Sequence, residues 1–138
     1  MEKIRGLRHT VLWPHLNTVD QCQIPPDRAE TTFHLAAVLK NTVIGTATFI
    51  VDVNKCFEEQ NQYRLRAMAT DPNYRGIGVG RLILKKAIQE LKRKKVKILW
   101  CDARINATVF YEKQNFKVKG RVYQIPKIGP HKLMYIEL

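Results

Sequence analysis

Residues 75–80 have the sequence Arg-Gly-Ile-Gly-Val-Gly and lie between a predicted strand and a predicted helix. Glycine allows successive backbone N–H groups to converge on one point, and the helix that follows adds the positive end of its dipole. A turn of this kind binds phosphate. Arg75, Arg81, Lys85 and Lys86 lie on or near the turn and could add charge-assisted contacts. The segment therefore predicts a site for a multiply phosphorylated ligand.

Two familiar phosphate-binding turns fit this segment badly. A P-loop needs Gly-x-x-x-x-Gly-Lys-Ser/Thr, a pattern that does not occur in the sequence. A Rossmann turn needs Gly-x-Gly-x-x-Gly directly after a strand, whereas Arg81 stands at the third glycine position and four loop residues intervene. Asp102 lies near the spacing expected for a ribose-binding acid, which keeps a dinucleotide site open as an alternative. The antiparallel strands predicted upstream argue against it.

The elements that must position this turn follow from hydrophobic periodicity and turn residues. We expect helices at Ile4–Leu12, at about 82–91 and at about 106–114, and strands at Thr32–Leu39, Val43–Val53, Tyr63–Thr70, Val96–Cys101, Lys117–Gln124 and Lys132–Leu138. Residues 40–42 would join the first two strands as a hairpin, and residues 126–130 would form the last turn. Asn115 would end the last helix, because asparagine tolerates the left-handed conformation. This order predicts an α+β fold in one domain spanning residues 1–138.

Composition limits the class of protein. The chain carries 24 Lys and Arg against 12 Asp and Glu, a net charge of +12 that favours anionic partners. Its cysteines, Cys22, Cys56 and Cys101, are odd in number and widely spaced, which predicts neither a disulfide framework nor a metal site. Residues 1–16 lack the apolar core of a secretory signal, and no apolar run approaches the roughly 20 residues that cross a bilayer. We expect a cytoplasmic protein that does not enter the membrane.

Two motifs, in the correct order, resemble the GNAT superfamily of acetyl-CoA-dependent N-acetyltransferases. The family signature Arg/Gln-x-x-Gly-x-Gly/Ala between a strand and a helix is matched in full at residues 75–80. Residues 107–116 resemble the family's Ala-x-x-x-Tyr-x-x-x-Gly-Phe segment, with Asn115 in place of the glycine. The resemblance covers residues 63–138 well and the first 60 residues only through a compatible order of elements. The type is that of the small single-domain bacterial members.

The resemblance implies a mostly antiparallel sheet whose two central parallel strands splay apart to admit acetyl-CoA. The strand that ends at Met68, Ala69 and Thr70 would bind the pantetheine arm, and a main-chain N–H near Ala69 would polarise the thioester carbonyl. The pyrophosphate would be held at Arg75, Gly76, Ile77, Gly78, Val79, Gly80 and Arg81. Arg104 stands where many members have a cofactor-binding asparagine, so that contact does not transfer.

Tyr111 falls on the family's tyrosine, which would protonate the departing coenzyme A thiolate. The alternative is that it only packs a short helix together with Phe110. A protonated amine must lose a proton before it attacks, yet the sequence names no clear base. His131, in a Gly-Pro-His run similar to one in some small bacterial members, and Asp102, at the mouth of the splayed strands, are the candidates. For each, a surface or structural role is the alternative.

The resulting hypothesis is direct transfer of an acetyl group from acetyl-CoA to a primary amine of a small molecule or peptide. Cys101 near the opening would be a buried structural thiol rather than an acyl carrier. The alternatives are a non-catalytic acyl-CoA-binding protein and a basic nucleic-acid-binding module. The run Lys92–Lys95 and a pI near 9.9 would support the nucleic-acid-binding module. The sequence contains no other motif typical of nucleic-acid-binding domains. A homodimer is compatible with the sequence, although no feature demonstrates one.

Overall fold

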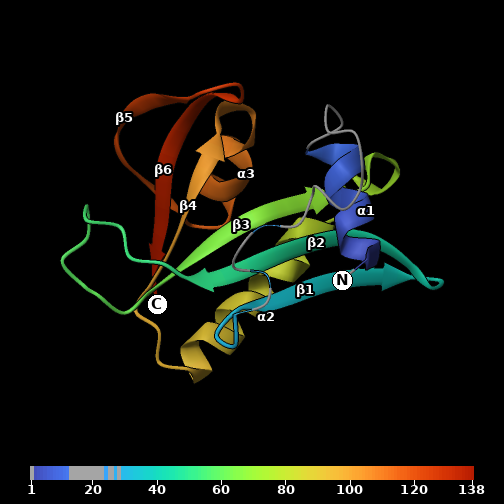
Figure 1. Ribbon diagram of the computed structural model, residues 1–138, viewed down its shortest axis with the longest axis horizontal. Coiled ribbons are helices and arrows are strands. Elements are labelled where there is room, and N and C mark those ends of the chain that lie inside the picture. Colours follow the sequence, from blue (N-terminus) through green and yellow to red (C-terminus); the bar gives the residue numbers. More distant parts are fainter. Residues whose placement is uncertain (1, 13–23, 25–26, 28) are drawn as a thin grey trace.

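The computed structural model describes residues 2–12, 24, 27 and 29–138 (Figure 1). The described residues form a six-stranded sheet with the strand order β1-β2-β3-β4-β6-β5. Its strands are β1 (Phe33–Leu39), β2 (Thr42–Val51), β3 (Gln62–Thr70), β4 (Ile98–Arg104), β5 (Lys117–Ile125) and β6 (Gly129–Glu137). The helices are α1 (Glu2–Val11), α2 (Val79–Arg93) and α3 (Thr108–Lys113), with the 3-10 turns η3 (Pro72–Tyr74) and η4 (Ile105–Ala107). The predicted mixed sheet with flanking helices is confirmed.

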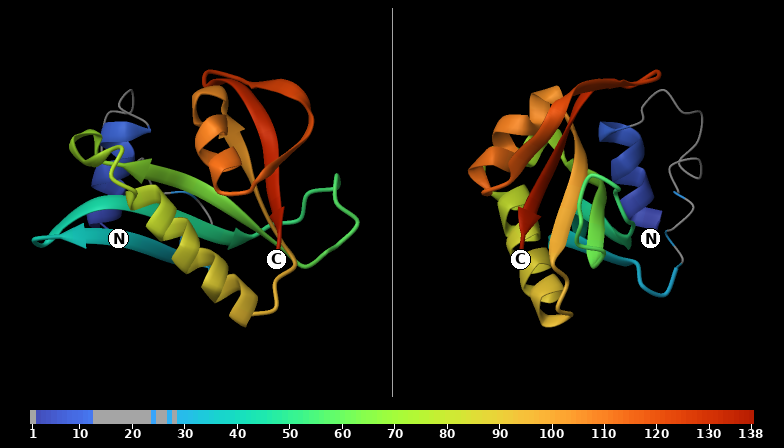
Figure 2. Two further views of the ribbon diagram at one scale, coloured as in Figure 1. Left: turned by 180° about the vertical axis from the view of Figure 1, so that it is seen from behind. Right: turned by 90° about the vertical axis from the view of Figure 1, so that its left-hand side faces the viewer.

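The helices form two layers on the sheet. Helix α1 lies on one face, and α2 and α3 lie on the other (Figure 2). The main core fills the space between the sheet and α2, where Leu84, Ala87 and Leu91 are almost fully buried at helical spacing. Tyr111 and Phe116 extend this core toward α3. The two faces of the sheet are thus covered by different helices, and any opening through the sheet would connect them.

The central strands β3 and β4 run parallel but stay paired only briefly. Three register pairs join them, from Gln62 with Ile98 to Arg64 with Trp100. Beyond these pairs the two strands diverge, as Figure 1 shows. The other neighbouring strands are antiparallel. Because the ladder ends at Arg64, the remaining part of β3 presents backbone hydrogen-bonding groups to the gap.

A buried polar cluster fixes α1 to the sheet. The Arg8 guanidinium donates to both carboxylate oxygens of Asp27, at 2.8 and 3.0 Å, and to Thr48 Oγ1 at 2.7 Å. His34 Nδ1 lies 2.8 Å from the same Thr48 hydroxyl. Burying these charges requires such partners, so the cluster specifies where α1 sits on β2 and β3.

Several boundaries differ from those expected. Helix α2 begins at Val79, three residues before the periodic pattern, because it starts directly from the Gly78 N-cap. Strand β4 continues to Arg104 because it pairs with β6 as far as His131. Strand β6 begins earlier, at Gly129, because its first residues pair with the end of β5. The helix expected at 106–114 divides into η4 and α3. Asn115 has a φ of +69°, as the predicted helix stop requires.

Candidate functional site

A cleft of about 720 Å³ occupies the gap between β3 and β4. Residues from both faces of the sheet line it, including Arg64 and Asp102 on the α1 side and Gly80 and Tyr111 on the α2 side. Of the residues predicted to bind the cofactor, the cleft is lined by Met68, Ala69, Thr70, Arg75, Gly76, Gly78, Val79, Gly80 and Arg81. Ile77 is not among the lining residues, and its side chain is exposed. The fold therefore brings two separate motifs to one cavity.

A β-bulge in β3 lies at the centre of the cleft. Thr46 pairs with Ala69 and Thr48 pairs with Arg66, so Ala47 alone stands opposite both Ala67 and Met68. Ala67 has a φ of +53°, a left-handed conformation that is uncommon for any residue other than glycine. Bulges re-aim backbone and side chains and are found next to functional sites. This one changes which groups of β3 face the gap, in the part of the strand that lines the cleft.

The glycine turn connects β3 to α2 and ends at the helix N-terminus. Gly76 and Gly78 have φ values of +79° and +91°, which side-chain-bearing residues rarely adopt. The helical bond from Leu82 N to the Gly78 carbonyl measures 3.0 Å, so the preceding N–H groups have no partner one turn earlier in α2. A β-carbon on Gly80 would lie 3.0 Å from the Phe110 ring, which keeps the turn close to α3. Converging amides at a bare helix N-terminus fit a diphosphate.

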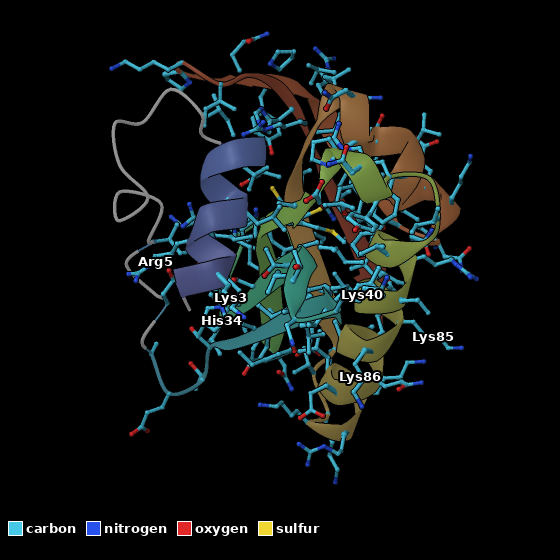
Figure 3. All side chains as sticks on the ribbon, turned by 90° about the vertical axis from the view of Figure 1, so that its right-hand side faces the viewer. Lys3, Arg5, His34, Lys40, Lys85 and Lys86 are labelled. Carbon is cyan, nitrogen blue, oxygen red and sulfur yellow. The ribbon has the colours of Figure 1, made fainter. Side chains whose placement is uncertain are left out.

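The basic side chains near this turn divide into two groups. Arg75 and Arg81 line the cleft, and a β-carbon on Gly78 would lie 3.8 Å from Arg81 Nε, so this guanidinium stays close to the turn. Lys85 and Lys86 are exposed on α2 and project away from the sheet (Figure 3). Neither lysine lines the cleft, because both lie on the side of α2 that faces solvent. Their suggested phosphate contacts are therefore not supported.

Tyr111 is buried at the α3 side of the cleft. Its hydroxyl lies 3.7 Å from Met68 Sδ, and its ring packs against Phe110 and Phe116 with centroid separations of 5.2 and 5.3 Å. Burial first, and the neighbouring Cys101 thiol second, raise the pKa of Tyr111 well above its usual value. Its hydroxyl is therefore protonated at neutral pH and can serve as a proton donor. Packing and proton donation are compatible at this position.

Asp102 lies at the mouth of the cleft as expected, but its carboxylate is already engaged. One oxygen accepts a hydrogen bond from Arg64 Nη2 at 2.5 Å, and the other accepts one from the Tyr123 hydroxyl. Arg64 also contacts Asp52 at 3.2 Å and stacks over Trp100 at 4.8 Å. Burial first and the Asp102 carboxylate second raise the pKa of Tyr123, which keeps its hydroxyl a donor. The network ties β3, β4 and β5 together around the opening.

His131 is buried beside this network and lines the cleft. Its Nδ1 lies 2.8 Å from the Gly129 carbonyl oxygen, and its ring stacks on Tyr123 with a centroid separation of 6.2 Å. A carbonyl oxygen can only accept, so Nδ1 carries the hydrogen and Nε2 is the nitrogen with a free lone pair in the neutral ring. The backbone contact thus sets the tautomer that a general base needs.

The sequence did not identify Arg64 and Arg66 as lining residues of this cleft, or Tyr123 as the partner of Asp102 and His131. Arginines alternate with apolar residues in the sequence of β3, which places them on opposite faces of the strand. The sequence alone does not show which of the two faces lines a cavity. Tyr123 lies on β5, which is separated from β4 by β6, and its side chain reaches across β6 to Asp102. The order of these strands in the sheet is not visible in the sequence. His34 belongs to the polar cluster under α1, the side chain of His9 is not described, and His15 lies outside the described residues.

Among residues 2–12, 24, 27 and 29–138, no group of three or more His, Cys, Asp and Glu side chains is arranged to hold a metal ion. Within the same residues no helix is long and apolar enough to cross a membrane.

Comparison with known proteins agrees with this geometry. Residues 1–116 match the profile of the acetyltransferase (GNAT) family. The chain is 36% identical to the uncharacterized N-acetyltransferase YitI of Bacillus subtilis, over 98% of this chain and 90% of that protein. It is 33% identical to the ribosomal protein bS18-alanine N-acetyltransferase of Haemophilus influenzae, over 75% and 69% of the two chains. Its fold resembles an aminoglycoside 6'-N-acetyltransferase solved with coenzyme A, with a TM-score of 0.78, 13% identity and coverage of 99% and 89%. The splayed strands and the glycine turn therefore have a known context: this chain belongs to the GNAT family of acetyltransferases.

Proposed function

We propose that this protein, acting as one domain over residues 1–138, transfers the acetyl group of acetyl-CoA to a primary amine by direct attack. The observation that carries the proposal is the cleft between β3 and β4, which is lined from both faces of the sheet. A cosubstrate can thus enter from the α2 side and an acceptor from the α1 side, so both meet without a covalent enzyme intermediate. Acetyl-CoA supplies the activated acetyl group, and the protein supplies orientation.

The residues of the glycine turn hold the diphosphate in this proposal. The backbone amides from Arg75 to Gly80, at the start of α2, face the phosphates, and the Arg81 guanidinium adds a charge-assisted contact. Backbone groups of Met68, Ala69 and Thr70, left without a β4 partner, bind the pantetheine arm. The bulge at Ala67 aims an N–H at the thioester oxygen, where negative charge develops during attack.

Tyr111 and His131 handle the protons. The amine nitrogen attacks the thioester carbon, its proton passes to His131 Nε2, and the C–S bond breaks while the Tyr111 hydroxyl protonates the departing sulfur. Although burial raises the pKa of Tyr111, a thiolate in the same apolar surroundings also becomes more basic, so the transfer stays feasible. Asp102, held by Arg64 and Tyr123, keeps the opening in shape instead of accepting the proton.

Direct attack is favoured over a thiol-bound intermediate by the state of Cys101. Burial first and the Asp102 charge second raise the pKa of this thiol, so almost no thiolate is present at neutral pH. Incubation with acetyl-CoA alone should therefore leave Cys101 unmodified by intact-mass analysis and peptide mapping. An acetyl group found on Cys101 that then passes to an added amine would contradict direct attack.

The strongest basic run supports a structural role better than nucleic-acid binding. Lys92 and Arg93 occupy the last turn of α2, where cations complement the helix dipole. Arg93 pairs with Glu90, Lys94 lies over the Phe33 ring at 5.2 Å, and the Lys95 carbonyl accepts from the Asn61 side chain at 2.8 Å. We therefore propose a small-molecule or peptide amine as the partner. We place the reaction in the cytoplasm, and nothing in the described cleft requires a second subunit.

The first test is calorimetric titration of the protein with acetyl-CoA, with NADH and a short DNA duplex as controls at two salt concentrations. Saturable binding of acetyl-CoA alone, followed by release of coenzyme A when amines are added, supports the transferase. Binding of acetyl-CoA with no amine-dependent release across a broad panel would support a non-catalytic acyl-CoA-binding protein. Salt-sensitive DNA binding without acetyl-CoA binding would contradict the proposal altogether.

A further inference from the structure

We propose that the acceptor is a small primary amine that also carries a carboxylate, and that the Arg66 guanidinium binds this carboxylate. The inference rests on the proposed transfer to an amine and names the substrate class of that same cleft. It depends on the position of Arg66, on the absence of a partner for it among the described residues, and on the charge of the residues that line the cleft.

Strand alternation places Arg66 on the acceptor side. Tyr63 and Leu65 pack into the core against α2, so the intervening Arg64 and the following Arg66 face the α1 side of the sheet. Arg66 lines the cleft and is the last residue before the bulge at Ala67. Its guanidinium therefore extends from a backbone position next to the proposed site of attack, on the side from which the amine approaches.

The other arginines on this face have partners. Arg64 is bound to Asp52 and Asp102, and Arg8 is bound to Asp27 and Thr48. Arg104 Nη2 donates to the Leu12 carbonyl oxygen at 3.4 Å. Each of these arginines therefore has at least one partner among the described residues.

Arg66 is the exception. Its side chain is half-buried, yet it makes no hydrogen bond or ion pair with the part of the chain that the structure describes. Desolvation first and the Arg64 charge second lower the pKa of Arg66, which means that its charged form is held at a cost. A carboxylate would offset both effects, because the planar guanidinium can donate two parallel hydrogen bonds to it.

The charge of the lining points the same way. Among the described residues that line the cleft, Asp102 is the sole carboxylate and is already bound by Arg64 and Tyr123. Of the described arginines, five line it; with Arg75 and Arg81 at the glycine turn and Arg64 in the ion pair, Arg66 and Arg104 remain as cations on the acceptor side. Such a site repels polyamines and attracts anions. Nearby cations also favour the uncharged form of a bound amine, which is the form that attacks. A carboxylate on the acceptor thus holds a molecule whose amine the site itself would otherwise repel.

The test compares matched acceptors that differ only in charge. Glycine, β-alanine, 4-aminobutanoate and 6-aminohexanoate are each paired with the corresponding primary amide, and coenzyme A release gives kcat/KM at fixed acetyl-CoA. At least one acid should exceed its amide by about tenfold or more, as expected for a charge-assisted contact. In Arg66→Gln this ratio should fall to near one, and Arg66→Lys should keep part of it.

Arg121→Gln is the matched control, because Arg121 is exposed on β5 and does not line the cleft. It should keep the wild-type ratio, and thermal denaturation checks that each variant is folded. A second readout needs no turnover: the N-acetylated acids should bind the coenzyme A-saturated protein in calorimetry, whereas their amides should not. Equal rates for acids and amides, or an unchanged preference in Arg66→Gln, would overturn this inference and leave the transferase intact. Product binding that depends on Arg66, with no turnover of any amine, would support the inference and contradict the proposed activity.

Discussion

Arg64 Nη2 on β3 donates to a carboxylate oxygen of Asp102 on β4 at 2.5 Å. Arg64 belongs to the last backbone pair of these strands, with Trp100, and Asp102 lies two residues further along β4. The ion pair therefore holds the strands at the point where their ladder ends. Both side chains are about one-fifth exposed, at 23% and 21%, so solvent screens the pair only in part. Its position makes it a structural part of the opening.

A double-mutant cycle of Arg64→Met and Asp102→Asn measures this bridge. Because the pair is partly buried and hydrogen-bonded, we expect a coupling of about 1–2 kcal/mol in the free energy of unfolding from urea denaturation. The exposed pair Arg93 and Glu90 on α2 serves as the control and should show much weaker coupling. Equal coupling in the two cycles would mean that the bridge contributes nothing special.

Substitution of His131 by Gln should lower kcat/KM at pH 7 by roughly 100-fold, since general bases contribute about this much. The loss should narrow as the pH rises toward 9.5, because a larger fraction of a primary amine is then already neutral. A pH profile of kcat/KM for both proteins gives the comparison. A loss of the same size at every pH would assign His131 to packing against Tyr123.

Replacement of Tyr111 by Phe should leave the Kd for acetyl-CoA nearly unchanged and lower kcat by roughly 100-fold, as expected when a proton donor is lost. Because the pKa of Tyr111 is raised well above its usual value, its hydroxyl keeps the proton throughout the range from pH 7 to 9.5. Ionisation of Tyr111 should therefore cause no decline in activity in that range. Calorimetry and steady-state kinetics test the two parts. An equal loss of binding would show that the ring only packs.

Gly78→Asp should weaken acetyl-CoA binding by at least about 100-fold, because it places a negative charge where phosphate approaches the backbone. Gly120→Asp is the matched control: Gly120 also has a positive φ, +81°, and open space around it, but it does not line the cleft. It imposes a similar backbone strain and should bind acetyl-CoA normally in calorimetry. Equal affinities of the two variants would place the phosphates elsewhere.

The lowered pKa of Asp27 should make the stability of the fold depend on pH. Burial raises the pKa of Asp27, but hydrogen bonds from Arg8 and the Ile24 N–H outweigh it, so the net pKa is lowered. A lowered pKa stabilises the fold above the unfolded value near 3.8, and this stabilisation disappears as the pH falls through the folded value. Asp27→Asn should therefore cost about 3 kcal/mol at pH 6 in urea denaturation, and the cost should shrink progressively as the pH falls below about 3.8. Glu112→Gln, at an exposed site, should change little over the same pH range.

The sequence was sufficient where the structure depends on local chemistry. Gly76 and Gly78 adopt a left-handed conformation that suits their residue type, and Asn115 ends α3 as its residue type predicts. The phosphate role of the turn stays a prediction. The comparisons confirm the family, and the sheet confirms the fold. The roles given to Tyr111 and His131 stay predictions.

What the sequence could not supply depends on contacts between distant strands. The bulge at Ala67 places alanine where glycine is the usual choice, so no residue signal announced it. The Arg64, Asp102 and Tyr123 network joins β3, β4 and β5, whose order in the sheet decides which polar side chains meet. That Arg66 has no partner among the residues the structure describes is likewise a property of the assembled cleft and not of its position in the chain.

The short ladder between β3 and β4 has a consequence for the lifetime of the protein. Three register pairs join the half-sheet β1–β3 to the half-sheet β4–β6, so local opening there needs few hydrogen bonds to break. A ligand that fills the gap and binds the unpaired edge of β3 would stabilise the contact between the two half-sheets. Because such binding stabilises the folded state by mass action, we expect protease resistance to rise with acetyl-CoA concentration, so that the abundance of the protein would follow the supply of its own cosubstrate.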